Sequence, residues 1–354
     1  MITYAEWLPT LDIPEQQIDL VHPPKSQSTA PFTNITLLHK NAIRPAAIGP
    51  DPAIQSRLLQ HLHQLLKDDS QFSANVPPEL QSSYQKLKKH AQTNTQNAEA
   101  SVDFYVLRCV EFLSEVLEVL QPELGWKARQ QWAGNSKLGI TPDVVVVDSL
   151  DNVKLLIEDK TRKVLEKHIN TLESMQVQFD WTQNNMQLFT KGSAYSMLIK
   201  LICVMLEQHL AYAFLVDGTR YCILQATQNT KGDNIILISS FLSLADPHFP
   251  FLSIMLSSLL VASSTTEQVP RSLAVPAAIV QSSLNWPKVT ASHLNKNKGP
   301  AKLDATIASN DIETEDCSPS QATDALMTEG RMRNQSNDSG IVLAYQVCLK
   351  YSTK

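Results

Sequence analysis

The chain has 354 residues, a formal net charge of −5 at pH 7 and five cysteines. The mildly negative charge argues against a protein that grips nucleic acid by bulk electrostatics, and cysteines without CxxC or His-rich spacing argue against a zinc site or a disulfide scaffold. No secretory signal pattern opens the chain, so we expect an intracellular protein, cytoplasmic or nuclear.

Residues 1–97 are interpreted as an N-terminal extension that is rich in proline and partly helical. Prolines recur between Pro9 and Pro52 and interrupt regular structure there. Leucines at helical spacing between Ile54 and Leu66 predict a short amphipathic helix that packs on the core or on a partner. Residues 84–97 are polar enough to form either a helix or a linker, so the boundary stays open within them.

The strongly periodic segments fall in residues 98–264, which we interpret as one α/β domain. Apolar residues at helical spacing predict a helix from Val102 to Leu120, ended by Pro122 and Gly125. Residues 126–132 then alternate tryptophan and alanine with polar side chains, which predicts a first strand.

The run from Ile140 to Lys160 predicts a β-hairpin. Four consecutive valines at 144–147 favour a buried strand, residues 150–152 supply a turn, and residues 153–157 form the second strand. The hairpin therefore carries polar residues at the open end of both of its strands.

The register of this hairpin decides which side chains meet. A short loop centred on Leu150 and Asp151 sets Asp143 directly opposite Glu158. Because side chains alternate along a strand, Glu158 and Lys160 share one face while Asp159 points to the other. Two acids and a lysine are thus expected to converge.

Further elements follow the hairpin. A largely apolar helix is predicted from Ala194 to Leu210, and two apolar runs around Asp217 and Gly218 predict a second hairpin. The apolar run from Phe249 to Ala262 falls short of the roughly 20 residues that span a membrane, so we expect a buried helix and no membrane partner. Residues 265–354 are polar and are expected to form a disordered tail.

The predicted convergence suits phosphodiester chemistry. Carboxylates such as Asp143 and Glu158 bind Mg²⁺ and leave positions for water and phosphate oxygens. The ammonium group of Lys160 would orient or help to deprotonate an attacking water and offset the charge of the transition state. The alternative is a surface hairpin whose Glu158 and Lys160 form an ion pair that has no function and contributes little to stability.

At these residues the chain resembles a known family. Pro142 and Asp143, followed after a hairpin by Glu158, Asp159 and Lys160, resemble the PD…(D/E)xK signature of the restriction-endonuclease-like nuclease superfamily. The resemblance implies a core of helix, three strands, helix and strand, with a central mixed sheet flanked by helices. It also implies Mg²⁺ or Mn²⁺ as cofactor, DNA or RNA as substrate, and Asp143, Glu158 and Lys160 as catalytic residues.

Two further features of the superfamily have candidates here. Members often carry another acid on the first helix that reaches toward the metal, and Glu111 is the candidate for this ligand, with Glu115 as the alternative. Some members use a Gln and a Tyr on the later helix. This chain offers Tyr195, but Lys191 stands where the Gln is expected, which departs from the exonuclease-like branch.

The segments TPDVVVVD, LLIEDKT and AYAFLVDGTRYCIL also resemble the nuclease-like region found beside protein-kinase domains in mushroom-type fungal proteins and in Crinkler-type effectors. This resemblance implies a kinase domain or another protein as a partner. It leaves open a second interpretation, in which the nuclease fold is a catalytically silent interaction or regulatory module. The chain itself has no kinase signature.

Basic residues gather around the signature and would either line a phosphate-binding face or serve only solubility. They are Lys127, Arg129, Lys137, Lys154, Lys160, Arg162, Lys163 and Lys167.

Overall fold

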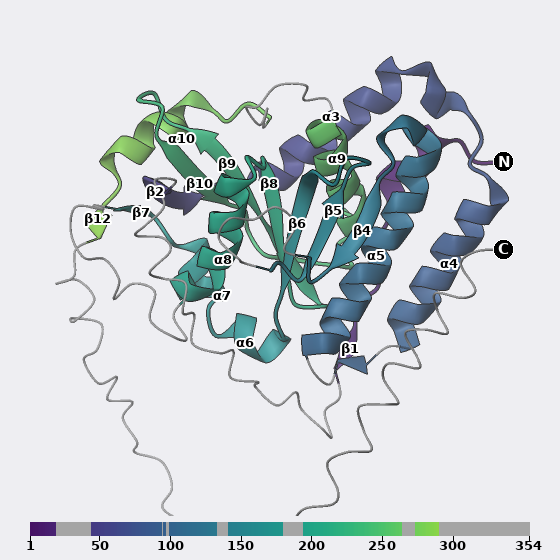
Figure 1. Cartoon of the computed structure of the whole chain (residues 1–354), viewed down its shortest axis with the longest axis horizontal. Helices are drawn as coiled ribbons and strands as arrows, with labels where there is room; N and C mark the ends of the chain where they lie inside the picture. The colour runs from purple at the N-terminus through teal and green to yellow at the C-terminus, as the bar shows by residue number, and fades with distance from the viewer. Residues whose placement is uncertain are drawn as a thin grey trace, which may run out of the picture. The chain divides into compact units, whose positions relative to one another are not determined.

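A mixed β-sheet organises the protein in the computed structural model (Figure 1). The structure describes residues 1–18, 44–93, 95–96, 99–132, 141–179, 194–263 and 273–289, all within one compact unit of residues 1–299. The strands lie in the order β12-β7-β2-β10-β9-β8-β6-β5-β4, and β11 pairs with β9 outside this path. Their bounds are β2 Ala47–Pro50, β4 Lys127–Gln130, β5 Val144–Val147, β6 Val153–Asp159, β7 Val177–Phe179, β8 Tyr212–Val216, β9 Arg220–Gln228, β10 Asn234–Ile238, β11 Leu242–Ser243 and β12 Lys288–Val289.

Helices cover both faces of this open sheet, as predicted for an α/β protein. One face packs a large apolar core against α3, α4, α5 and α9, and the other packs a second core against α6, α7 and α8. Two short strands, β1 Gln17–Ile18 and β3 Thr95–Gln96, pair apart from the main sheet. The helices are α1 Tyr4–Trp7, α3 Ile54–Asp68, α4 Pro78–Thr93, α5 Glu99–Leu120, α6 Arg162–Glu166, α7 Ile169–Glu173, α8 Ala194–Glu207, α9 Phe251–Ser263 and α10 Ala277–Ser282.

The central part of the sheet follows the order helix, three strands, helix, strand. Helix α5 precedes the antiparallel strands β4, β5 and β6, and α8 precedes β8, which lies parallel to β6. Helices α6 and α7 and strand β7 are inserted between β6 and α8. Since β6 and β8 are parallel, their carboxyl ends lie at the same edge of the sheet.

The predicted hairpin forms with the predicted register. Val144 pairs with Ile157 and Val145 pairs with Leu156, and the register shifts only between Val146 and Val147, near the turn. In the turn, the Asp148 carboxylate accepts hydrogen bonds from the backbone N–H groups of Leu150 and Asn152, each at 2.9 Å. Local sequence therefore fixes the alignment that places Asp143 beside the end of β6.

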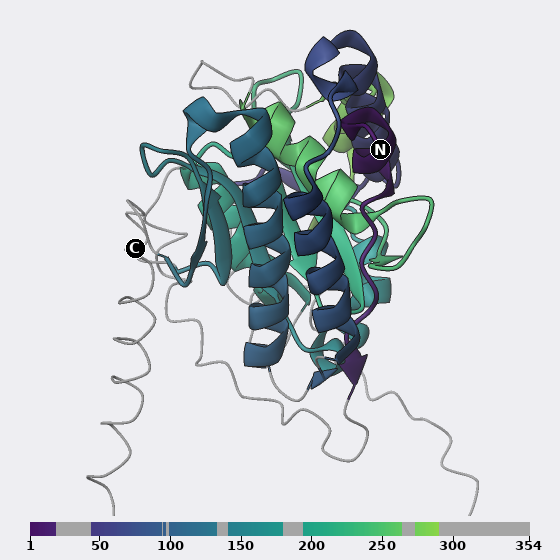
Figure 2. The ribbon, with the colours of Figure 1, turned by 90° about the vertical axis from the view of Figure 1, so that its right-hand side faces the viewer.

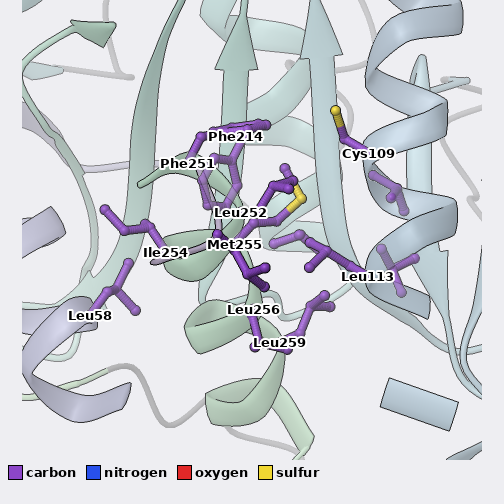
Figure 3. Packing of buried hydrophobic residues seen from close by; sticks show 14 of the residues in the cluster. Leu58, Cys109, Leu113, Phe214, Phe251, Leu252, Ile254, Met255, Leu256 and Leu259 are labelled. Atoms are coloured by element: carbon purple, nitrogen blue, oxygen red, sulfur yellow. The ribbon is translucent and has the colours of Figure 1, made fainter. Parts of the chain in front are cut away.

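Helix α9 is the buried helix predicted from the apolar run after residue 249. Its side chains fill the space between α3, α5 and the sheet (Figure 3). The hydroxyls of Ser253 and Ser257 donate 2.6 Å hydrogen bonds to the backbone oxygens of Leu8 and Leu58, so these buried polar groups are satisfied. None of the described helices is long and apolar enough to cross a membrane.

The segment at residues 273–289 corrects the expectation that disorder begins at residue 265. It forms α10 and β12, and it buries Trp286, whose ring lies against Gly49 of β2. Besides Trp286, the apolar side chains of Leu273, Val275 and Ile279 pack against the same core. The rest of the predicted tail lies outside the described residues.

Candidate active site

The three signature residues lie together at one edge of the sheet, at the lower ends of β5 and β6 in Figure 1. The backbone N–H of Lys160 donates to Val216 O at 2.9 Å, which extends the pairing of β6 with β8 beyond Glu158. On the other side, Gln131 N–H donates to Asp143 O at 2.9 Å and holds that residue beside the end of β4. Backbone pairing on both sides thus positions the site.

The ammonium group of Lys160 lies between the two carboxylates. Its Nζ is 2.7 Å from Glu158 Oε1 and 3.7 Å from Asp143 Oδ2, and it also donates to the backbone oxygen of Asp159. Glu158 and Lys160 are only 3% and 8% exposed, whereas Asp143 is half-buried. The arrangement is therefore a nearly buried ion pair that reaches solvent at Asp143.

Asp159, on the opposite face of β6, adds an acid that the sequence analysis did not assign. Its backbone N–H donates to Asp143 Oδ2 at 3.0 Å, and its own carboxyl group is 1% exposed. Burial raises the pKa of Asp159, and the nearby charges of Asp143 and Asp103 raise it further, while Lys160 lowers it less.

The protonation state of Asp159 follows from these contacts. Neither of its carboxyl oxygens has a hydrogen-bond partner among the described residues, so no donor stabilises a negative charge there. Burial and the nearby acids raise the pKa of Asp159 to about 11. The neutral acid is therefore the favoured form of Asp159 at neutral pH.

Asp103 is the acid of helix α5 that acts on this cluster. It is 7% exposed, and its charge contributes to the raised pKa of Asp159. A sequence signal for Asp103 exists, because it continues the apolar stripe of the helix through Val106 and Val110 at spacings of three and four. An acid on an apolar stripe is a better candidate than an acid on the polar face.

The predicted helix acids, Glu111 and Glu115, have partners on α5 and α4. Glu111 pairs with Arg108 at 2.8 Å, and the alternative, Glu115, accepts a 2.6 Å hydrogen bond from Ser83. Both acids line a cleft of about 370 Å³ between α4 and α5, which lie side by side (Figure 2). Eight residues separate Glu111 from Asp103, about 12 Å along the helix axis at 1.5 Å per residue.

The basic residues predicted around the signature do not form one face. Lys127 pairs with Val147 at the turn end of the hairpin, and Lys154 lies 3.4 Å from Asp148 of the turn. Arg162, Lys163 and Lys167 instead follow Lys160 at the site end of β6. Lys137 and Lys191 lie outside the described residues, and Tyr195 falls on α8 without a described side chain.

A metal ion at this site would have two carboxylate ligands, from Asp143 and Glu158. Within the described ranges, no three His, Cys, Asp or Glu side chains are arranged to hold one ion. Mg²⁺ in proteins retains several waters and is commonly bound by only one or two carboxylates together with substrate phosphate oxygens. Asp143 and Glu158, which already flank a cation, are hard oxygen ligands of the kind that Mg²⁺ requires, so the donor set fits this ion.

Comparisons with protein-family models, with curated proteins and with solved structures find no match to this chain.

Proposed function

We propose that the protein is a Mg²⁺- or Mn²⁺-dependent nuclease that hydrolyses phosphodiester bonds of DNA or RNA. The observation that carries this proposal is the Lys160 ammonium group held between Asp143 and Glu158 at the carboxyl end of β6. The order α5, β4, β5, β6, α8, β8 also supports it, because the PD-(D/E)XK resemblance implies this order.

Each residue has a chemical role in this proposal. Asp143 and Glu158 would hold the metal ion, which would supply Lewis-acid stabilisation of the scissile phosphate and make a water more acidic. Lys160 positions the attacking water through Nζ and offsets the negative charge that grows on the phosphate oxygens. Asp159 donates a backbone hydrogen bond to Asp143 and fixes the direction of its carboxylate.

In this proposal Asp103 helps to keep Asp159 in its neutral form. Its carboxylate disfavours ionisation of Asp159, so the cluster retains a proton that limits repulsion among the three aspartates. We assign it a positioning role in place of the ligand role expected for Glu111.

A second candidate function is a catalytically silent nuclease-fold module that binds a kinase domain or another protein. The burial of Glu158 and Lys160 favours it, because the ammonium group already neutralises the carboxylates without a metal ion. The two functions differ in one measurable property, which is the binding of Mg²⁺ at Asp143 and Glu158.

The test compares the wild type with Glu158→Gln, Lys160→Met and the matched control Glu111→Gln on DNA and RNA, with Mg²⁺ or Mn²⁺. We expect both site variants to lose cleavage by about 10²-fold or more, since each removes charge stabilisation of the transition state, and Glu111→Gln to cleave like the wild type. Circular dichroism must show that each variant is folded, because breaking a buried ion pair costs about 3–5 kcal/mol.

Calorimetric titration of Mg²⁺ gives a readout that does not depend on turnover. Binding by the wild type and by Glu111→Gln, but not by Glu158→Gln, is expected for the nuclease. A folded wild type that neither binds Mg²⁺ nor cleaves would leave the silent module as the function. If Glu111→Gln lost as much cleavage as the two site variants, Glu111 would be a residue of the active site.

A further inference from the structure

Helix α6 begins two residues after Lys160, so it lies at the margin of the candidate site (Figure 1). Lys163 and Lys167 are four residues apart and both exposed, which puts them on neighbouring turns of one face. In the described parts of the chain no acidic group pairs with either lysine, whereas Arg162 lies 3.9 Å from Glu166. The segment therefore presents two solvent-facing cations beside the site.

This arrangement is locally unfavourable. Lys163 lies in α6 and Lys167 is its C-cap residue, so two like charges lie four residues apart and repel each other, and exposed lysines gain no packing energy in return. The helix is held by Leu165, which is fully buried in the core that α7 and α8 also line. The buried Leu165 thus sets the positions of Lys163 and Lys167. Packing does not explain why both of these residues are positively charged.

Thr161, the residue between Lys160 and helix α6, is a second locally unfavourable feature. It occupies the N-cap position but its side chain makes no capping hydrogen bond. It is only 5% exposed, and its Oγ1 has no hydrogen-bond partner in the described structure. A buried hydroxyl without a hydrogen-bond partner destabilises the folded state. Local rules that fail in adjacent residues beside a candidate site are typical of functional segments.

We propose that Lys163 and Lys167 bind the phosphate backbone of the nucleic acid on one side of the scissile bond. The proposal rests on the proposed function and names the surface that holds its substrate. Lysine is a compact charge on a flexible stem, suited to phosphate contacts that carry no sequence information. The protein has a net charge of −5, so its overall charge repels nucleic acid. A local cationic segment beside the site would attract the phosphate backbone there.

The turn end of the same hairpin supplies a matched control. Lys127 and Lys154 lie there, at the opposite end of β5 and β6 from the site, and Lys154 is paired with Asp148. A Lys127→Gln/Lys154→Gln protein loses the same two charges as a Lys163→Gln/Lys167→Gln protein. A difference between the two therefore reports position rather than net charge.

The experiment measures binding of a fluorescent 20-nucleotide single strand, as DNA and as RNA, to the full chain without divalent cations over a range of KCl concentrations. Each phosphate contact contributes about −0.7 to the slope of log K against log salt for single strands. We expect Lys163→Gln/Lys167→Gln to make the slope less steep by about 1.4, and the control pair to leave it unchanged.

An unchanged slope in the α6 variant, an equal loss in the control pair, or a wild type that binds neither strand would each overturn the inference. Cleavage by the wild type in Mg²⁺ decides the proposed function separately. If the lysines of α6 influence the salt dependence of binding but the wild type does not cleave, the interface stands and the nuclease activity is rejected. If the wild type cleaves but the α6 variant leaves the slope of log K against log salt unchanged, only the interface is rejected.

Discussion

Asp159 shows how one residue couples the charge of the site to the stability of the fold. The side chain is buried among acids, and the folded protein keeps it neutral by holding a proton. The unfolded chain releases that proton near pH 4, the ordinary value for aspartate, at about 3.9. Above that pH the folded state binds more protons than the unfolded state, so the free energy of unfolding falls as pH rises.

Asp159→Asn removes this titration while keeping the shape of the neutral acid. We expect the variant to be more stable than the wild type at pH 7. We also expect the stability difference to grow by up to about 1.4 kcal/mol for each pH unit between pH 5 and pH 8. Urea unfolding of both proteins across this range, without divalent cations, measures the difference. Parallel pH profiles would mean that Asp159 is ionised in the folded protein.

At the scale of elements, the hairpin was predictable because its determinants are local. Four valines, a turn with Asp148 and a second apolar strand fix the register, and the register fixes which residues face each other. The choice of an acid on α5 is less well determined by the sequence. Spacing identifies the buried stripe of a helix, but which acid approaches the sheet depends on how α5 packs, and Asp103 is the buried acid among the described side chains of that helix.

Strands with distant partners were not predictable. β2 lies in the proline-rich segment and pairs in parallel with β10, nearly two hundred residues later, and β7 and β12 are short. Short strands carry too little periodicity to be recognised, and their pairing is decided by burial across the whole sheet. The docking of residues 273–289 includes a contact between residues far apart in the sequence, Gly49 and Trp286, beside the pairing of β12 with β7.

Gly49→Ala tests that contact. A Cβ atom at this position would overlap the ring of Trp286, and overpacking of this kind costs about 1–3 kcal/mol. In the Trp286→Leu background the same substitution should cost much less, giving a coupling energy of about 1 kcal/mol or more in a double-mutant cycle. Chemical unfolding of the four proteins supplies the cycle. Additive effects would show that the segment does not rest on β2.

For the molecule as a whole, the predicted extension and the predicted nuclease-like domain share one core. Residues 1–18 and 44–93 contribute buried side chains to the sheet face that α5 and α9 also cover, and α3 packs against α9. Tyr105 donates a 2.8 Å hydrogen bond to Pro14 O, and Gln16 N–H donates to Gly218 O at 2.7 Å. The N-terminal residues thus support the elements that carry the candidate site.

A polypeptide of residues 98–264 should therefore fail to fold, whereas residues 1–299 should unfold cooperatively. Removal of residues 1–97 takes away the fully buried Leu8, Leu11, Ile13, Leu58 and Leu62. Each such side chain contributes about 1.5–3 kcal/mol, so these five together approach or exceed the whole stability of a typical domain, about 5–15 kcal/mol. We expect the short polypeptide to bind a hydrophobic dye and to show no cooperative transition in urea. A sharp transition in residues 98–264 would instead make the site an independent domain, and the N-terminal helices would then be an accessory layer on it.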